Sequence, residues 1–568
     1  MKVIIVGGVA GGASAAARLR RLDETAEIIM LERSGYISYA NCGLPYYVGG
    51  EITDREALTL QTPESFFERF HVDVRVNSEA TAIDLAQKEV TVRNLADGTT
   101  YTEHYDKLVL SPGARPVRPP LPGIDNARVF TMRTVEDTLA LRGFIDEHHP
   151  KRAVVVGGGF IGLEMTENLM QAGLAVDLVE RLDQVMAPLD YDMACTLHGY
   201  LRKKGVGLHL STAVAGFEEA PGGIRTLLEG GSALESDLVL LAIGVSPDTR
   251  LAADAGLELG ARGSIKVTDR MQTSDPDVYA VGDAVQVNSI LTQQPTLLPL
   301  AGPANKQGRI AADNICGRDS HFAGVQGTAV LKLFNMTAAA TGLNEKAAKA
   351  AGLAYDRTIT FSANHASYYP GATNMTVKVL FDPETGRLLG AQIVGFDGVD
   401  KRIDVLATAI RAGMTGLDLT ELELAYAPPY GSAKDPVNMA GFVIENVLTR
   451  TVRQFHWDEV DTLPRDGSVT LLDTRTDEEV AHGRIAGTVH IPLDSLRDRA
   501  GELDPKKPVY INCHSGLRSY IACRILSQRG FTCYNLSGGW RFYDLVKRQQ
   551  KLDTTPAHPC GLPINGAK

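Results

Sequence analysis

The stretch VIIVGGVAGG, residues 3–12, decides the fold because it joins a buried-strand pattern directly to a glycine-rich turn. A helical pattern follows over residues 13–22, and a second apolar run over residues 28–31 ends at Glu32. Strand, turn, helix and strand predict a βαβ unit, in which the helix N-terminus can hold a pyrophosphate and the terminal acid a ribose. Val9 replaces the middle glycine of the G-x-G-x-x-G pattern, so this stretch by itself is weak evidence.

The same unit recurs further along the chain. Residues 153–162 read AVVVGGGFIG, which contains the full G-x-G-x-x-G pattern, and a strand pattern over residues 176–179 ends at Glu180. Two such units, each with its strand, helix and terminal acid, are strong evidence where one is not. They predict two dinucleotide sites, one for a prosthetic group and one for an exchanged cofactor.

Composition and charge limit the remaining possibilities. A chain of 568 residues is too long for one core and predicts three or four domains. The net charge of −11 argues against nucleic acid or a membrane as partner, and no apolar run reaches the roughly 18 residues of a membrane span. The seven cysteines form no CxxC pair, which argues against a disulfide framework or a metal site and fits reactive thiols in the cytoplasm.

A third segment adds to the first dinucleotide site. Residues 273–284, TSDPDVYAVGDA, predict a turn and a strand that lead to Asp283. Together with the two βαβ units, this segment resembles the two-dinucleotide flavoprotein disulfide reductases over residues 1 to about 445. The resemblance implies an α/β fold with two Rossmann-like domains, an α+β dimerisation domain and assembly as a homodimer. The implied ranges are 1–150 and 266–325 for FAD, 151–265 for NAD(P), and 326–450 for dimerisation.

The same resemblance implies which residues hold the cofactors. For FAD they are Gly7, Gly8, Ala10, Gly11, Gly12, Glu32, Arg33, Ser111, Gly113, Asp283 and Ala301. For NAD they are Gly157, Gly159, Phe160, Ile161, Gly162, Glu180 and Gly244. The carboxylate of Glu180 favours NADH, because it pairs with a 2′-OH and repels a 2′-phosphate, while the neighbouring Arg181 keeps NADPH open.

The C-terminal part forms a further domain. Residues 469–475 read VTLLDTR and residues 509–519 read VYINCHSGLRS, and this part resembles a single α/β rhodanese domain over residues 455–552. A tail follows over residues 553–568. Four residues separate Cys513 from Arg518, a length that favours sulfur transfer over phosphate chemistry, and the backbone N–H groups of such a loop can surround the sulfur. We expect Cys513 to carry sulfane sulfur, Arg518 to stabilise it, and Cys523 and Cys533 to be core residues; Cys560 is assigned no role.

Cys42 lies in SYANCGLPY, residues 38–46, with no second cysteine nearby in sequence. It must therefore form a mixed disulfide or a sulfenic acid instead of an internal disulfide. A helix that opens at Cys42 would favour the thiolate. Here, and over residues 364–372 and 425–430, the chain resembles the coenzyme A-disulfide reductases, which implies that two tyrosines of the partner subunit approach the cysteine. Tyr368 and Tyr426 are the candidates, with Tyr369 and Tyr430 as alternatives.

A coenzyme A substrate requires cations for its phosphates. The resemblance implies contacts from Ser14, Arg18, Arg21, Ser38, Asn41 and Lys434. Arg18 and Arg21 are three residues apart and so share a helix face. Phe70, beside Arg69, stands where the family has a lysine, which puts the adenine-nucleotide end of the predicted site in question.

These patterns predict an NAD(P)H-dependent FAD enzyme that reduces coenzyme A disulfide, coenzyme A persulfide or polysulfide through Cys42 and handles sulfane sulfur at Cys513. Two alternatives stay open. One is an NADH oxidase or peroxidase that works through a Cys42 sulfenic acid, although such relatives carry a histidine in the first glycine-rich turn and this chain has Ala10. The other is a redox scaffold that recruits a sulfur carrier.

Overall fold

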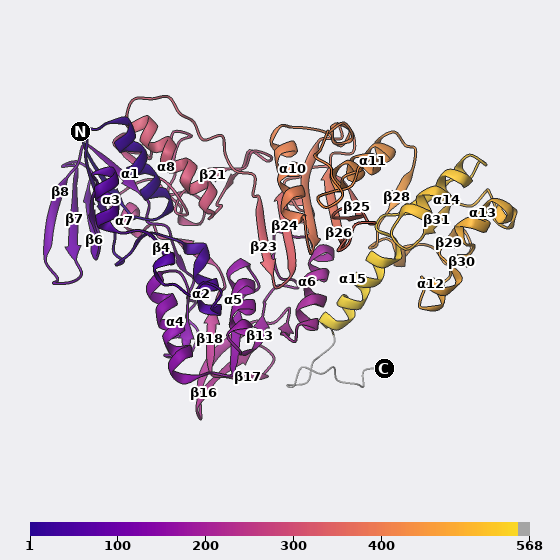
Figure 1. Ribbon diagram of the computed structural model, residues 1–568, viewed down its shortest axis with the longest axis horizontal. Coiled ribbons are helices and arrows are strands. Elements are labelled where there is room, and N and C mark those ends of the chain that lie inside the picture. Colours follow the sequence, from indigo (N-terminus) through magenta and orange to yellow (C-terminus); the bar gives the residue numbers. More distant parts are fainter. Residues whose placement is uncertain (555–568) are drawn as a thin grey trace. The chain divides into compact units, whose positions relative to one another are not determined.

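The computed structural model describes residues 1–554, which divide into two compact units (Figure 1). Unit 1 comprises residues 1–182 and 205–325, and unit 2 comprises residues 183–204 and the described chain from residue 326 to residue 554. All but the first two residues of the predicted tail, including Cys560, lie outside the described residues. Among the described helices, none combines the length and the apolar character needed to cross a membrane.

The first half of unit 1 is a parallel sheet in the order β20-β9-β1-β2-β5. Helices α1 and α8 pack against each other and cover the face that carries Val3, Ile5 and Met30, while strands β6 and β7 pack on the opposite face. Because β20 pairs with β9, residues near 280 complete a sheet that begins at residue 2. The elements are β1 (Lys2–Val6), α1 (Ala10–Leu22), β2 (Glu27–Leu31), β3 (Ile37–Tyr39), α2 (Leu44–Gly49), β4 (Thr59–Gln61), α3 (Pro63–Phe70), β5 (Asp73–Arg75), β6 (Ser78–Asp84), β7 (Glu89–Asn94), β8 (Thr100–His104), β9 (Lys107–Leu110), β20 (Val278–Ala280), β21 (Val287–Asn288), β22 (Pro295–Thr296) and α8 (Ala301–Ile315).

The second half of unit 1 repeats this plan. Its parallel sheet runs in the order β11-β18-β12-β13-β14, and the antiparallel strands β15, β16 and β17 pack against it. Strands β10 and β19 pair with each other and link the two halves. The elements are β10 (Ala114–Pro116), β11 (Val129–Phe130), α4 (Val135–His148), β12 (Arg152–Val156), α5 (Phe160–Gln171), β13 (Ala175–Val179), β14 (Gly207–His209), β15 (Val214–Ala220), β16 (Gly223–Leu228), β17 (Ala233–Ser236), β18 (Leu238–Leu241), β19 (Val245–Pro247) and α7 (Arg250–Asp254).

The two glycine-rich turns have the same geometry. Gly7 and Gly157 have φ angles of +100° and +111°, a region that side chains with a Cβ rarely adopt. A Cβ on Gly12 would lie 1.9 Å from the carbonyl oxygen of Gly7, and one on Gly162 would lie 1.8 Å from that of Gly157. Glycine is therefore required twice in each turn, once for its backbone conformation and once for the close approach of helix and strand.

Unit 2 begins with an antiparallel sheet in the order β23-β24-β27-β26-β25. Helix α10 packs on β24 and β27, and α11 packs on β25. Helix α6 lies within the range predicted for the NAD(P)-binding domain, yet its contacts place it in unit 2, where it packs on β27 and α15. The elements are α6 (Tyr191–Lys203), β23 (Ala329–Leu333), β24 (Met336–Gly342), α9 (Glu345–Ala350), β25 (Asp356–Ala363), β26 (Asn374–Phe381), β27 (Leu388–Gly395), α10 (Val399–Arg411) and α11 (Pro436–Leu448).

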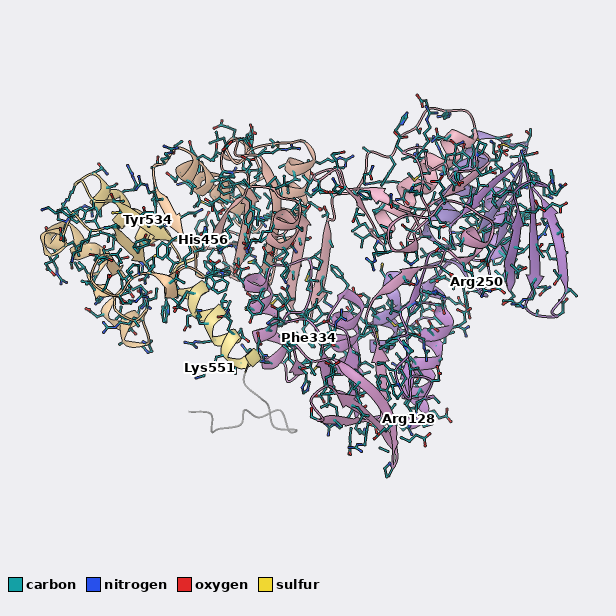
Figure 2. The ribbon with its side chains drawn as sticks, turned by 180° about the vertical axis from the view of Figure 1, so that it is seen from behind. Arg128, Arg250, Phe334, His456, Tyr534 and Lys551 are labelled. Atoms are coloured by element: carbon teal, nitrogen blue, oxygen red, sulfur yellow. The ribbon has the colours of Figure 1, made fainter. Side chains whose placement is uncertain are left out.

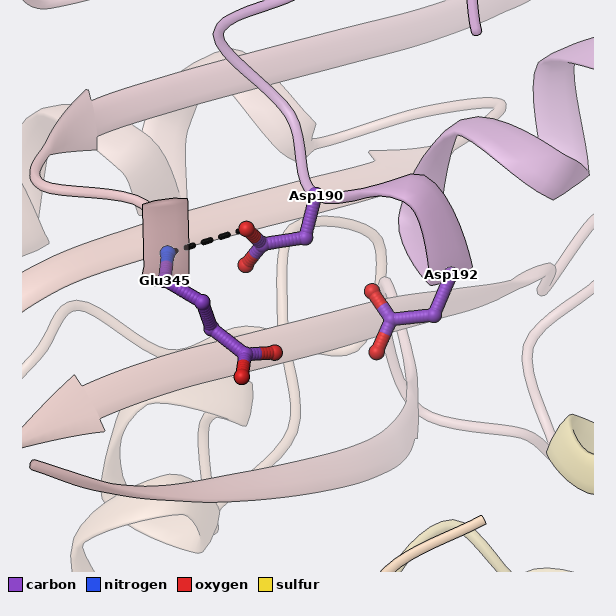
Figure 3. A group of neighbouring side chains, drawn as sticks. All are labelled: Asp190, Asp192 and Glu345. Atoms are coloured by element: carbon purple, nitrogen blue, oxygen red, sulfur yellow. Dashed lines mark hydrogen bonds between the residues drawn. The ribbon is translucent and has the colours of Figure 1, made fainter. Parts of the chain in front are cut away.

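A buried charge cluster explains why α6 belongs to unit 2. Asp190, Asp192 and Glu345 bring their carboxylates together, and the backbone N–H of Glu345 donates to Asp190 at 2.9 Å (Figure 3). The ammonium group of Lys378, which is fully buried, lies 3.0, 2.8 and 2.6 Å from these three carboxylates. The ammonium group of Lys378 therefore occupies the place where these three carboxylates could otherwise bind a metal ion.

The C-terminal part of unit 2 is a parallel sheet in the order β28-β32-β31-β29-β30. Its side chains are drawn in Figure 2, where His456 and Tyr534 are labelled. Tyr534 stacks on Tyr510 with ring centroids 4.6 Å apart. The elements are β28 (Arg453–Phe455), β29 (Thr470–Asp473), α12 (Asp477–Ala481), β30 (Val489–His490), α13 (Leu493–Arg499), β31 (Val509–Asn512), α14 (Leu517–Ser527), β32 (Cys533–Leu536) and α15 (Gly539–Thr554).

Candidate functional site

The first glycine-rich turn leaves a helix end available to a ligand. No side chain among the described residues caps the N-terminus of α1, so its first backbone N–H groups keep their capacity to bind an anion. Glu32 reaches back to this turn and accepts hydrogen bonds from the backbone N–H of Gly8 at 2.8 Å and of Ser34 at 2.9 Å. Burial raises the pKa of Glu32. A free helix end beside a fixed carboxylate fits the pyrophosphate and ribose of a dinucleotide such as FAD.

Asp283 lies three residues beyond β20, and burial raises the pKa of its carboxyl group. Arg133 pairs with Asp283 at 3.1 Å and donates from Nε to the backbone carbonyl of Ala114 at 3.0 Å. With its amide oriented to satisfy both groups, Asn41 donates to the backbone carbonyl of Arg133 at 3.1 Å and accepts from its guanidinium. Arg133 therefore connects the predicted flavin acid to the residue before Cys42. The sequence did not single out Arg133, because no motif surrounds it.

The other residues predicted to hold FAD follow strand β9 or begin helix α8, except for Arg33. The backbone N–H of Ser111 donates to the carbonyl of Val6 at 2.7 Å, which places the turn after β9 beside the turn after β1. Gly113 has a φ angle of +71°, and Ala301 is the first residue of α8. Arg33, in contrast, forms an ion pair with Asp248 at 2.9 Å.

The second glycine-rich turn has the same free helix end. None of the described side chains caps the N-terminus of α5. Glu180 accepts from the backbone N–H of Gly158 at 2.6 Å and of Leu182 at 2.7 Å, as Glu32 does in the first turn. A Cβ placed on Gly159 or Gly244 would meet no described atom within 4 Å, so open space adjoins both glycines. These residues fit a second dinucleotide.

Cys42 lies in a single turn of 3-10 helix, Asn41–Gly43, immediately before α2, and its side chain is exposed. The pKa of its thiol is raised, first by burial among its neighbours and then by the carboxylate of Glu164, while Arg133 acts in the opposite direction. The direction of this shift is opposite to the one expected from a helix that opens at Cys42.

Glu164 is a second residue that the sequence did not identify. It lies on α5, which packs against α2, the helix that follows Cys42. Burial and the neighbouring Glu167 raise the pKa of Glu164 to about 7. A carboxyl group that changes charge near neutral pH beside a thiol can control how readily the thiol ionises.

The two candidate tyrosines lie together in unit 2. The hydroxyl groups of Tyr368 and Tyr426 are 2.8 Å apart, and their side chains are 74% and 48% exposed. Of the alternatives, Tyr369 packs edge-on against His365 at 5.6 Å between ring centroids, whereas Tyr430 is 73% exposed. Exposed, mutually hydrogen-bonded hydroxyl groups are suited to contact a second subunit.

A buried arginine holds the two tyrosine loops in place. Arg402 is 2% exposed, and its Nη2 donates to the backbone carbonyl of Asn364 at 2.8 Å and to that of Tyr430 at 3.3 Å. The same nitrogen lies 2.9 Å from Asp435, which caps α11. The backbone N–H of Ala366 also donates to the carbonyl of Gly431 at 2.8 Å. The Tyr368 and Tyr426 loops are therefore fixed to one another.

The predicted coenzyme A residues differ in how available they are. The hydroxyl of Ser14 donates to Asn305 at 2.7 Å, which marks Asn305 as a further candidate. Arg18 pairs with Asp313 at 2.7 Å, so its charge is already partly neutralised. Arg21 and Lys434 are exposed, and Ser38 holds a left-handed backbone conformation with a φ angle of +45°. These assignments stay predictions.

Cys513 follows β31 and is 1% exposed. Its sulfur accepts hydrogen bonds from the backbone N–H of Gly516 at 3.1 Å and from the hydroxyl of Ser519 at 3.2 Å. Arg518, which was expected to stabilise this sulfur, forms a two-point ion pair with Glu479 at 2.6 and 2.7 Å. The loop thus surrounds the sulfur with hydrogen-bond donors, while its cation is held by a carboxylate.

The other cysteines of residues 1–554 are free thiols, as Cys42 and Cys513 are. Cys523 and Cys533 belong to the core of the C-terminal domain, as expected. Cys195 is buried on α6, and Cys316 is partly exposed.

Comparison with known protein families agrees with this architecture. Residues 1–308 match the model described as "Pyridine nucleotide-disulphide oxidoreductase", and residues 328–436 match the dimerisation domain of the same family. The chain belongs to the pyridine nucleotide-disulphide oxidoreductase family. Residues 456–543 of this oxidoreductase match the rhodanese-like domain. The predicted α/β fold with Rossmann-like, dimerisation and rhodanese domains is confirmed.

Some of the proteins similar to this oxidoreductase match both its flavoprotein part and its rhodanese-like part. It is 36% identical over 442 residues to coenzyme A disulfide reductase of Staphylococcus haemolyticus, covering 78% of this chain and 98% of the relative. The structure of reduced Bacillus anthracis CoADR-RHD is 48% identical with a TM-score of 0.94, covering 96% and 98% of the two chains. A NAD-dependent persulfide reductase from A. fulgidus is 38% identical with a TM-score of 0.89, covering 95% and 100%.

These findings confirm several of the predictions. The suspected relationship to the coenzyme A-disulfide and persulfide reductases with a rhodanese domain is confirmed, and the protein is an oxidoreductase with a fused sulfurtransferase-like domain. The family uses FAD and a nicotinamide cofactor, as expected. A dimerisation domain is present, in line with the predicted homodimer.

Proposed function

We propose that this protein is a homodimeric, cytoplasmic FAD enzyme that uses NADH to reduce S–S bonds carried by coenzyme A, as disulfide, persulfide or polysulfide. The observation that carries the proposal is the presence of two different cysteine sites in one chain. Cys42 is exposed beside the first dinucleotide turn, and Cys513 is buried in a loop of hydrogen-bond donors. The first arrangement suits reduction and the second suits storage of sulfane sulfur.

Cys42 is assigned the role of nucleophile. Its thiolate would attack the S–S bond of the substrate, so that one sulfur stays on Cys42 as a mixed disulfide or persulfide and the other leaves as a thiolate. When bound, FAD supplies the two electrons that return Cys42 to a free thiol, drawn from the reduced nicotinamide. Glu32 and Asp283 are the carboxylates that would hold FAD, and Glu180 would hold the ribose of NADH.

Tyr368 and Tyr426 are assigned to the departing thiolate. Their paired hydroxyl groups are exposed and fixed by Arg402, so in a homodimer they can donate a hydrogen bond or a proton to the leaving sulfur of the opposite site. The candidates for coenzyme A are Ser14, Arg21, Ser38, Asn41 and Lys434, with Asn305 beside Ser14, whereas Arg18 is already paired with Asp313.

Three serine variants of the full-length, FAD-loaded enzyme test the proposal. In Cys42→Ser we expect NADH-dependent reduction of coenzyme A disulfide and persulfide to fall by at least about 10³-fold, because the alcohol is not ionised at neutral pH. In Cys513→Ser we expect reduction of coenzyme A disulfide near the wild-type rate and complete loss of sulfur transfer to cyanide. Cys316→Ser, at a partly exposed thiol, is the matched control and should retain both activities.

The outcomes distinguish the proposal from its alternatives. Substantial turnover by a folded, FAD-loaded Cys42→Ser enzyme would refute the assignment of Cys42. Rapid NADH oxidation by wild type with oxygen or peroxide, but none with coenzyme A disulfide or persulfide, would favour the oxidase or peroxidase. If no sulfur substrate and no oxygen species is reduced, the scaffold is favoured.

A further inference from the structure

Arg518, the cation of the Cys513 loop, is paired with the carboxylate of Glu479. Both terminal nitrogens of Arg518 donate to Glu479, at 2.6 and 2.7 Å, and such two-point pairs are among the stronger ion pairs in proteins. Glu479 is held in turn by the start of α12, where its carboxylate accepts from the backbone N–H of Thr476 at 2.9 Å. The side chains of Arg518 and Glu479 are 31% and 29% exposed, so the pair lies at the protein surface.

Glu479 remains ionised at neutral pH. Its hydrogen bonds from Arg518 are the main cause that lowers its pKa to about 2. The imidazole of His514 lies 3.8 Å from the carboxylate of Glu479. Burial lowers the pKa of this imidazole, so His514 does not supply a positive charge in place of Arg518. The pair therefore contributes no net charge next to Cys513.

Two other arginines lie near the loop, and one of them is paired with a carboxylate. Arg475 is 1% exposed and pairs with Asp473 at 2.7 Å. Arg541 stacks over the ring of Phe361, 4.6 Å from its centroid, and is exposed to solvent. Backbone and hydroxyl donors of the loop thus contact the sulfur directly, while Arg541, which stacks on an uncharged ring, keeps its positive charge.

We infer that Glu479 sets the donor specificity of Cys513, because it withholds the charge of Arg518 that a doubly charged donor requires. The site then favours sulfur donors with a single negative charge or none, such as organic persulfides and thiosulfonates, over thiosulfate. This inference rests on the proposed sulfur transfer at Cys513. Glu479 acts through Arg518 and is a positioning residue for specificity.

The transfer needs no external oxidant or reductant. The Cys513 thiolate attacks the outer sulfur of the donor, a bond forms between the two sulfurs, and the bond between the outer sulfur and the rest of the donor breaks. Thiosulfate leaves as sulfite, a thiosulfonate as a sulfinate, and a persulfide as a thiolate. These donors differ in size and in leaving group as well as in charge, so the effect of charge near Cys513 is read from how each donor's rate changes when only that charge is altered.

The test compares two donors that differ by one charge. Thiosulfate carries two negative charges and benzenethiosulfonate one, and both transfer sulfur to Cys513 and then to cyanide, so thiocyanate measures both. In Glu479→Gln of the full-length enzyme, Arg518 keeps one hydrogen bond but becomes a net cation. We expect the ratio of kcat/KM for thiosulfate to that for benzenethiosulfonate to rise about tenfold, equivalent to about 1.4 kcal/mol, chiefly through a lower KM for thiosulfate.

Two further variants separate charge from structure. Glu478→Gln removes an exposed charge from the adjacent position and should leave the ratio at the wild-type value. Glu479→Asp keeps the charge and should restore most of the wild-type preference. A ratio in Glu479→Gln within twofold of wild type, or equal losses with both donors, would overturn the inference.

The same measurement distinguishes a failure of this inference from a failure of the proposed function. If wild type forms thiocyanate from benzenethiosulfonate but Glu479→Gln leaves the ratio unchanged, only the role of Glu479 is refuted. If wild type transfers sulfur from no donor while reducing coenzyme A disulfide normally, sulfur handling at Cys513 is refuted, and the inference fails with it.

Discussion

Glu164→Gln is expected to lower the pKa of the Cys42 thiol and to make it react faster in mildly alkaline solution. After burial, the carboxylate of Glu164 is the leading cause that raises this pKa. Because the pKa of Glu164 is raised to about 7, the group is largely neutral at pH 6 and largely negative at pH 8 (about one unit on either side). The effect of the substitution should therefore emerge as the pH rises through 7.

The size of the effect follows from the Coulomb interaction of two like charges. At an effective dielectric constant near 20, two charges several ångströms apart interact by about 1–4 kcal/mol. Cys42 is exposed, so screening by solvent reduces the interaction toward the lower end of that range. We expect the pKa of Cys42 to fall, and removal of about 1.4 kcal/mol of repulsion gives about a tenfold larger thiolate fraction at pH 8.

Alkylation by iodoacetamide measures this shift, since only the thiolate reacts. The rate at the Cys42 peptide is followed by mass spectrometry in the FAD-loaded enzyme between pH 6 and pH 9. The ratio of the rates in Glu164→Gln and wild type should be near one at pH 6 and close to tenfold at pH 8. Glu147→Gln, at an exposed acid on α4, is the control and should show a ratio of one throughout. A ratio for Glu164→Gln that does not change with pH would refute the electrostatic coupling.

Three further predictions concern the cofactor and the buried charges. Glu180→Ala should reduce the preference for NADH over NADPH by about tenfold in kcat/KM, because a carboxylate repels the 2′-phosphate; an unchanged preference would count against this role. Lys378→Met should lower the free energy of unfolding by about 3–5 kcal/mol in a urea titration, since it leaves the buried carboxylates of Asp190 and Asp192 without their cation, whereas the exposed Lys349→Met should cost less than about 0.5 kcal/mol. Glu345, whose pKa is lowered to about 2, should contribute stability fully above pH 4.5 and lose it as the pH falls toward 2, so Glu345→Gln should show a smaller acid-dependent loss than wild type over that range.

The two dinucleotide turns were predictable because their causes are local. Gly7 and Gly12 are close in sequence, and the contact between them follows from the turn that they form. The same holds for Gly157 and Gly162. The Cys513 loop is likewise a short segment after a strand, and the backbone and side-chain donors around its sulfur come from residues 516 and 519.

The surroundings of the reactive groups, in contrast, depend on residues far apart in the chain. Glu164 acts on Cys42 because α5 packs on α2, and Arg133 reaches Asp283 across 150 residues of sequence. Neither residue belongs to a recognisable motif, so periodicity and spacing could not reveal it.

The sequence by itself thus determined the two βαβ units, the rhodanese loop and the choice of Cys42 and Cys513 as the candidate reactive cysteines, since short-range geometry and residue chemistry define each of them. Only the tertiary structure decided the electrostatic state of those cysteines. Cys42 has a raised pKa because its neighbours bury it and because a carboxylate on another helix lies nearby, and Arg518 is held by Glu479 from α12. The physical reason is that charges interact through space, and folding alone determines which charges become neighbours.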